Sequence, residues 1–173
     1  TQAESSAASD VYKRQGGMHL SILVPYRNRR AHLLRFVPHT KTYLDHFQRG
    51  GLIDGYTIHI IEQLGHEPFN RGTLLNCGVQ IARAESNFVC LHDVDYLPVL
   101  ADYTAVYQPT RLIWHGLTLQ EDHATFFGAV VQLSVADFLK TNGYSNEYWG
   151  WGFEDVDLRF RCQLAGLTIG HRD

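Results

Sequence analysis

Hydrophobic residues fall into short apolar runs that alternate with helical spacings. Apolar runs rich in β-forming residues predict strands, and apolar residues three and four positions apart predict helices. The predicted strands cover residues 20–25, 56–62, 88–91 and 126–133, and another begins at 167–169. The predicted helices cover residues 31–47, 72–84, 135–141 and 154–165, and Pro38 is expected to interrupt the first. Strands alternating with helices require crossovers, so the pattern predicts an α/β fold, with a mostly parallel central sheet flanked by helices.

The two ends of the chain differ from this regular pattern. The first residues are small and polar, and residues 5–15 look like translated sequencing-adaptor DNA. We therefore expect residues 1–17 to be a non-native, disordered segment and residues 18–173 to form a single domain. Because the chain stops directly after an apolar segment, we expect this domain to be truncated at its C-terminus. Residues 99–125 show no period and are expected to be irregular.

Composition and charge narrow the class of protein. Of the 173 residues, 45% are hydrophobic and 19% charged, which is typical of a globular domain. The net charge of −3 disfavours a nucleic-acid partner. No apolar run approaches the roughly 20 residues of a membrane-spanning helix, so no membrane segment is expected. Cys77, Cys90 and Cys162 are too widely spaced for a typical zinc site; we expect buried thiols, and a disulfide remains the alternative.

An acidic pair follows the predicted strand 88–91. In Asp93-Val94-Asp95 the side chains alternate, so both carboxylates are expected on one side. Two carboxylates at a strand end can hold a divalent cation that leaves positions open for phosphates. Acidic residues also end many strands simply as turn formers.

A second motif opens the predicted helix 154–165. Tyr148, Trp149, Trp151 and two glycines precede three acidic residues in its first turn. A carboxylate beside flat aromatic rings suits deprotonation of a sugar hydroxyl while the sugar stacks on indole. The alternative is an aromatic core corner followed by acids that complement the helix dipole.

Basic residues lie near two further element ends. Tyr26, Arg27 and Arg29 follow the first strand, where arginine suits phosphate contacts and tyrosine suits base stacking. Arg71 precedes a predicted helix, a place where an anion can bind. Both features also fit exposed basic turns.

Together and in this order, these segments resemble the β-1,4-galactosyltransferase family, most closely its xylosylprotein branch. The matching segments are residues 24–29, 69–78, 92–98, 127–129 and 142–157. The resemblance implies a GT-A fold and transfer of galactose or a related hexose from a UDP-sugar donor to a saccharide or glycoconjugate acceptor. It also implies inversion at the anomeric carbon and a manganese ion.

The resemblance also implies roles for individual residues. The donor nucleotide would be bound by Pro25, Tyr26, Arg27, Arg29, Arg71, Asp93 and Val94. Asp95 would ligate the metal. The acceptor would be bound by Tyr148, Trp151, Gly152, Glu154 and Asp155. Asp155 would be the catalytic general base.

Several alternatives stay open. Val156 stands where the family typically has aspartate, so the motif also resembles N-acetylgalactosaminyl and glucuronosyl transferases of chondroitin-synthase type. A non-catalytic sugar-nucleotide-binding fragment is possible because further metal ligands of the family lie in a later His-containing segment, for which His171 is a substitute candidate. The strand-end Asp-x-Asp also resembles haloacid-dehalogenase-like phosphoryl-transfer enzymes, but Tyr96 departs from that pattern. The compartment would be cytoplasmic in a bacterium and the Golgi lumen in a eukaryote.

Overall fold

The computed structural model describes residues 17–113 and 126–172. The strands are β1 (His19–Tyr26), β2 (Gly55–Glu62), β3 (Phe88–His92), β4 (Thr110–Arg111), β5 (Val130–Ser134) and β6 (Gly170–His171). The helices are α2 (Arg30–Arg49), α3 (Arg71–Ala82), α5 (Val135–Lys140) and α6 (Glu154–Leu164). The predicted alternation of strands and helices is confirmed.

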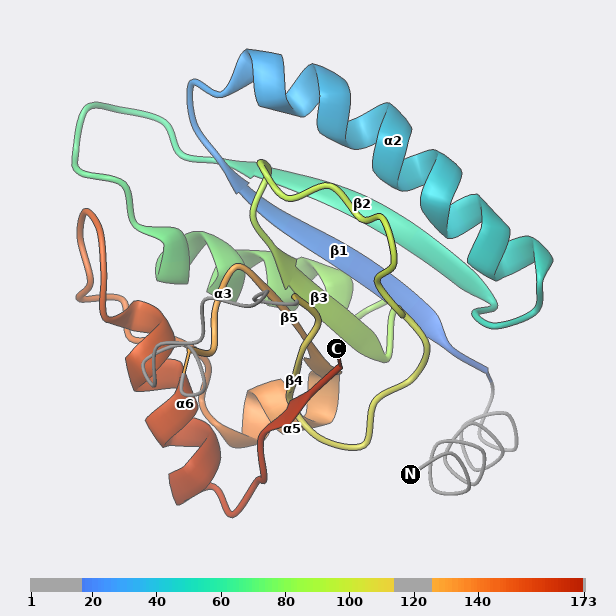
Figure 1. Cartoon of the computed structure of the whole chain (residues 1–173). Helices are drawn as coiled ribbons and strands as arrows, with labels where there is room; N and C mark the ends of the chain where they lie inside the picture. Colours follow the sequence, from blue (N-terminus) through green and yellow to red (C-terminus); the bar gives the residue numbers. More distant parts are fainter. Residues whose placement is uncertain (1–16, 114–125, 173) are drawn as a thin grey trace.

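The six strands form one mixed sheet in the order β2-β1-β3-β5-β4-β6 (Figure 1). β1 pairs in parallel with both β2 and β3, and β4 pairs in parallel with β6. β5 runs antiparallel to β3 and β4. The sheet is mostly parallel, and the carboxyl ends of β1, β2 and β3 meet at one edge.

Each face of the sheet has its own hydrophobic core. Leu20, Ile22 and Val24 of β1 pack in the core that includes buried residues of α2. Leu23 points to the other face, where its core includes residues of α3, α5 and α6. This alternation along β1 places α2 on one side of the sheet and the other three helices on the opposite side (Figure 1).

The prediction that Pro38 interrupts the first helix is wrong. α2 continues through Pro38 to Arg49. The hydrogen bond lost at proline would involve the carbonyl of Leu34, and both residues are exposed, so water can satisfy that carbonyl.

The strand boundaries in the second half of the chain also differ from prediction. β5 begins at Val130 instead of residue 126, and the last strand is at 170–171 instead of 167–169. Thr110–Arg111 forms a short strand inside the segment predicted to be irregular. Residues 1–16 and 114–125 lie outside the described residues.

The cysteines are all free in the structure. Cys90 and Cys162 are buried, as predicted, but Cys77 is exposed on α3 because its side chain points away from the sheet. Among the described residues, no helix is long and apolar enough to cross a membrane.

Candidate active site

A buried arginine joins the ends of three elements. Arg71, the first residue of α3, places Nε 2.7 Å from Asp93 Oδ1, just beyond β3. Its Nη1 lies 2.8 Å from Asp155 Oδ1, in the first turn of α6. Burial alone would lower the pKa of Arg71, but the negative charges of Asp155 and Asp93 raise it well above its ordinary value. The guanidinium is therefore charged and forms a bridge between two carboxylates.

The start of α3 is fixed by hydrogen bonds to the loop that precedes α6. Asn70 caps the helix: its side-chain oxygen Oδ1 accepts a hydrogen bond from the Thr73 backbone amide. Its side-chain nitrogen Nδ2 donates to the Asn146 backbone carbonyl at 2.7 Å. The Gly150 amide donates to the Phe69 carbonyl at 2.8 Å. These bonds set the position of Arg71 relative to the entrance of α6.

Among the described carboxylates, Asp155 has the pKa that is shifted most. Burial raises its pKa to about 6, Arg71 opposes this shift, and the nearby Glu154 and Asp93 charges add to it. Tyr144 opposes the shift through its hydrogen bond. A carboxyl group with a pKa near neutrality is suited to accept a proton and release it again.

The two oxygens of Asp155 have different surroundings. Oδ1 accepts from Arg71 Nη1 and, at 3.3 Å, from the Tyr144 hydroxyl. Among the described residues, Oδ2 accepts no hydrogen bond, and it faces Gly128 so closely that a Cβ at position 128 would overlap it. The described residues therefore engage Oδ1 and leave Oδ2 without a hydrogen-bond donor.

The sequence analysis assigned no role to Tyr144 or Gly128. Both lie inside the matched segments, but the contacts that join them to Asp155 depend on the tertiary structure. Tyr144 is buried, and its hydroxyl oxygen accepts a hydrogen bond from Arg71 Nη1 at 3.3 Å. In the sequence, Tyr144 only precedes the acidic motif by about ten residues, and that spacing does not indicate a contact with Asp155.

The aromatic loop before α6 presents a tryptophan to solvent. Gly150 and Gly152 have φ values of 89° and 105°, which glycine adopts without steric cost. Trp151 between them is fully exposed, and Phe153 enters the helix with φ of 69°. Gly152 therefore shapes the loop, while the indole of Trp151 is free to stack on a ligand.

The two other predicted acceptor residues lie on either side of this loop. Tyr148 is half-buried. The Glu154 side chain is 14% exposed, and its Oε1 lies 4.0 Å from Arg71 Nη1. Glu154 therefore belongs to the same charged cluster as Asp155.

The two carboxylates predicted to bind a metal, Asp93 and Asp95, have different surroundings in the structure. β3 ends at His92, so residues 93–95 form a turn and do not extend the strand. Asp93 points to Arg71, Val94 is buried, and Asp95 is exposed. The strand alternation from which both carboxylates were expected to face one side is therefore absent at residues 93–95.

Asp95 can serve as one ligand of a metal ion. Its carboxylate is a hard oxygen donor, and the residue is exposed. Those residues contain no group of three or more His, Cys, Asp or Glu side chains able to hold a metal ion. His171 lies on the edge strand β6, and β4 and β5 separate that strand from β3.

Four of the residues predicted to bind the donor nucleotide lie at or just beyond the carboxyl end of β1: Pro25, Tyr26, Arg27 and Arg29. Pro25 and Tyr26 are buried, which leaves little of the tyrosine ring for base stacking. Arg27 donates to the Glu67 carbonyl at 2.6 Å and lies over the Phe69 ring. Arg29 is exposed. The structure thus brings these residues to one edge, with Arg29 the most accessible of them.

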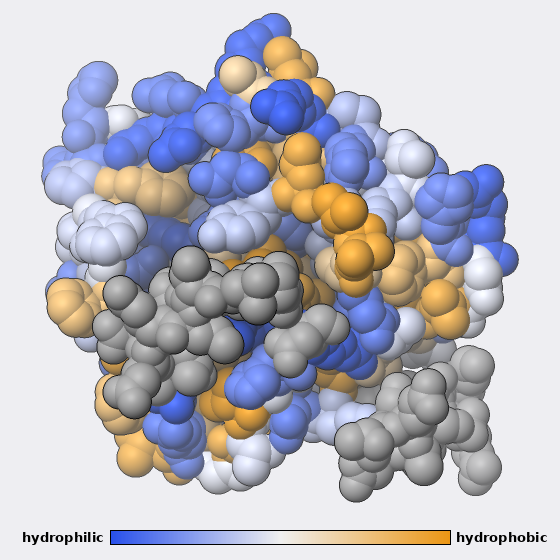
Figure 2. Space-filling model, viewed as in Figure 1, coloured by the Kyte–Doolittle hydropathy of each residue, from blue (hydrophilic) through white to orange (hydrophobic). Residues whose placement is uncertain are grey.

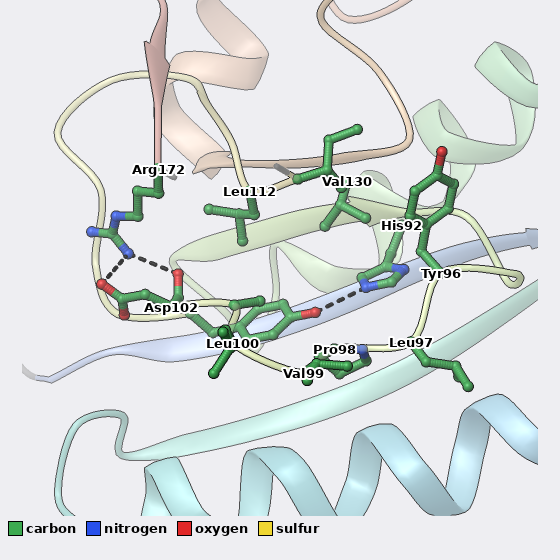
Figure 3. Close-up of a pocket in the computed structure, with 13 residues that line it drawn as sticks. His92, Tyr96, Leu97, Pro98, Val99, Leu100, Asp102, Leu112, Val130 and Arg172 are labelled. Atoms are coloured by element: carbon green, nitrogen blue, oxygen red, sulfur yellow. Dashed lines mark hydrogen bonds and ion pairs between the residues drawn. The ribbon is translucent and has the colours of Figure 1, made fainter. Parts of the chain in front are cut away.

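A separate cavity of about 590 Å³ lies between the loop 96–103 and the region of β4 and β5 (Figure 3). His92 lies at its wall and hydrogen-bonds the Tyr103 hydroxyl at 2.9 Å. Arg172, also in its lining, lies 3.1 Å from Asp102 Oδ2. Figure 2 shows hydrophobic side chains over the loop in front of the sheet, where Val99 and Leu100 are exposed. Neither Arg71 nor Asp155 lines the cavity.

The mixed sheet and the helices on its two faces form a GT-A fold. Residues 12–109 match the family model of the N-terminal region of glycosyl transferase group 7. Residues 113–173 match the model described as the N-terminal domain of galactosyltransferase. The chain belongs to the β-1,4-galactosyltransferase family.

Individual relatives agree with this assignment. Mouse β-1,4-galactosyltransferase 4 is 41% identical over 156 residues, which cover 87% of this chain and 44% of that protein. Drosophila β-1,4-galactosyltransferase 7 is 34% identical over 154 residues, which cover 87% of this chain and 46% of the relative. The chain spans less than half the length of these relatives.

Solved structures confirm the fold. The catalytic domain of Drosophila β-1,4-galactosyltransferase 7 in complex with xylobiose matches with a TM-score of 0.72 and 30% identity, covering 89% of this chain and 64% of that one. A mutant of the same protein in complex with manganese, UDP-Gal and xylobiose matches with a TM-score of 0.75. A mannosyltransferase from Pyrobaculum calidifontis, with 12% identity and a TM-score of 0.55, supports the fold alone.

Proposed function

We propose that this chain is the catalytic part of an inverting, metal-dependent galactosyltransferase that moves galactose from UDP-galactose to a hydroxyl of a saccharide acceptor. The observation that carries the proposal is Asp155, whose side chain is only 18% exposed, has one oxygen without a hydrogen bond among the described residues and lies in the helix turn that follows the exposed Trp151. The family membership and the relative bound to manganese, UDP-Gal and xylobiose support it.

Asp155 acts as the general base in this proposal. The acceptor hydroxyl oxygen bonds to the anomeric carbon of galactose as the bond from that carbon to the β-phosphate oxygen of UDP breaks. Asp155 Oδ2 takes the acceptor proton. Attack from the face opposite the leaving group inverts the anomeric carbon, and a single base is sufficient for this step.

The departing diphosphate needs positive charge. Arg71 Nη2 is buried and has no hydrogen-bond partner among the described residues, so it is available to a ligand oxygen. Arg29 adds an exposed cation at the same sheet edge. Asp95 would hold a divalent metal, manganese in this proposal, which when bound neutralises phosphate charge.

The acceptor is proposed to stack on Trp151. The flat face of an indole can stack on the apolar face of a pyranose ring. Trp151 is fully exposed, so its indole is accessible to such a sugar. Glu154 would then receive a second acceptor hydroxyl. A xyloside is the first acceptor to test, because xylobiose is the saccharide in the solved relative.

The test is turnover with a matched pair of variants. The chain is incubated with UDP-galactose, Mn²⁺ and a xyloside, and both UDP release and the disaccharide product are measured. We expect Asp155→Asn to lower kcat by about two to four orders of magnitude, while UDP binding measured by calorimetry is retained. The control is Asp157→Asn, two residues further on, where the carboxylate pairs with Arg161 instead. Equal loss in both variants would contradict the assignment of Asp155.

A sugar-nucleotide-binding module without turnover is the second candidate. It is favoured by one observation: the described residues gather no group of three metal-ligating side chains. A folded chain that binds UDP with Mn²⁺ but forms no product with UDP-galactose, UDP-N-acetylgalactosamine or UDP-glucuronic acid would establish this alternative. Product from either of the latter two donors would instead indicate a chondroitin-type transferase.

A further inference from the structure

The Tyr144 hydroxyl lies beside the Asp155 carboxylate and the Arg71 guanidinium. Tyr144 is 3% exposed, and its hydroxyl lies 3.3 Å from both Asp155 Oδ1 and Arg71 Nη1. The phenol can donate to the carboxylate while it accepts from the guanidinium. It therefore links the two charged groups inside the protein.

The ring that carries this hydroxyl is held in place on several sides. The Tyr144 amide donates to Asn76 Oδ1 at 2.9 Å, and its carbonyl accepts from Asn76 Nδ2 at 2.9 Å. The ring packs against Phe138, and a Cβ at Gly72 would come within 2.9 Å of the Tyr144 Cβ. Such packing leaves the hydroxyl little freedom to move.

We infer that Tyr144 is a positioning residue for the general base: its hydroxyl, with Arg71, holds Asp155 Oδ1 so that Oδ2 faces Gly128 and receives the acceptor proton. This inference rests on the proposed function of Asp155. Rotation of the carboxylate would exchange its oxygens, and the two donors on Oδ1 oppose that rotation. A tyrosine at position 144 thus selects which oxygen acts.

The first test compares Tyr144→Phe with the wild-type chain. The substitution removes one oxygen and keeps the packed ring. We expect kcat for transfer from UDP-galactose to a xyloside to fall about three- to tenfold, as for loss of one long hydrogen bond to a charged group, while KM for UDP-galactose is unchanged. The control is Tyr56→Phe, which removes a 2.5 Å hydrogen bond to Asp45 between α2 and β2 and should leave kcat unchanged.

The second test reads the carboxyl group itself, without turnover. NMR titration of Asp155 in the free chain should show a higher pKa in Tyr144→Phe, because the tyrosine hydrogen bond lowers it. The other charged groups that face Asp155 are Arg71, Asp93 and Glu154, and they are unchanged in this variant. The acid limb of the kcat profile should move to higher pH by the same amount.

The outcomes separate this inference from the proposed function. If the wild-type chain transfers sugar and Tyr144→Phe has an unchanged kcat and an unchanged Asp155 titration, the inference is overturned. If the wild-type chain transfers no sugar, the proposed function fails, and the titration alone decides whether Tyr144 holds the carboxylate. Should the phenylalanine variant not fold, replacing Tyr144 with 3-fluorotyrosine strengthens the donor and should lower the pKa of Asp155; no change would refute the contact.

Discussion

Arg71 Nη1 lies 2.8 Å from Asp155 Oδ1, although the two residues are 84 positions apart in the chain. The same guanidinium binds Asp93 through Nε. One side chain therefore joins the strand-end turn proposed for the donor to the helix start proposed for the acceptor. Any shift of Arg71 would be transmitted to both halves of the proposed site.

Removing the charge of Arg71 should destabilise the protein. Arg71→Met leaves two partly buried carboxylates without their cation, so we expect the free energy of unfolding to fall by about 3–5 kcal/mol. Urea unfolding measures the loss. The control is Arg161→Met, which breaks an i,i+4 pair with Asp157 and should cost about 0.5 kcal/mol. Similar losses in the two variants would mean that the buried bridge adds no more than a surface pair.

Gly128 should be essential for activity. A Cβ at this position overlaps Asp155 Oδ2, so Gly128→Ala must displace the carboxylate. We expect kcat to fall at least tenfold, since a displacement of about 1 Å in a reacting group can cost a hundredfold. The control is Gly55→Ala, whose Cβ meets only the side chain of His19. Sugar transfer and circular dichroism are measured for both, and an active Gly128→Ala chain would show that Asp155 tolerates the shift.

The elements that local sequence specifies were predicted well. The apolar run of β1 and the acidic first turn of α6 are both in the structure, because each depends on residues a few positions apart. The prediction that Pro38 interrupts the helix was wrong because the free-energy cost of a proline inside a helix depends on whether it lies on the solvent-exposed face. β4 was missed because a two-residue strand has no period of its own.

In the candidate site too, features set by local sequence were predicted, and contacts between distant segments were not. Asp155 was predicted as the base from its motif, and the structure adds the burial that raises its pKa. Its contacts with Arg71 and Tyr144 join segments from different parts of the fold, and their geometry follows from how α3 and α6 pack. The resemblance implies that Arg71 binds the nucleotide, and the structure adds that Arg71 bridges two carboxylates.

His92 and Tyr103 should be energetically coupled. His92 is buried between the Tyr103 hydroxyl, 2.9 Å from Nε2, and the Asp93 carbonyl, 2.9 Å from Nδ1. Each single change, His92→Leu or Tyr103→Phe, leaves a buried polar group unpaired and should cost about 1–3 kcal/mol. The double variant should be more stable than the sum of single losses implies, by about 1 kcal/mol, in a urea-unfolding cycle. Strict additivity would show that the pair contributes nothing.

Asp155→Asn should stabilise the protein at neutral pH while it removes turnover. The pKa of Asp155 is raised from 3.8 to about 6, so the folded chain binds this proton more tightly than the unfolded chain. Stability from this group is therefore full below pH 4 and is lost as pH rises through 6, a loss of about 3 kcal/mol. Asparagine resembles the protonated carboxyl, so the variant should match wild type near pH 4 and exceed it by up to about 3 kcal/mol at pH 8. Urea unfolding at pH 4, 6 and 8 measures the difference; a variant that is less stable than wild type at pH 8 would show that Arg71 outweighs the cost of burying the charge.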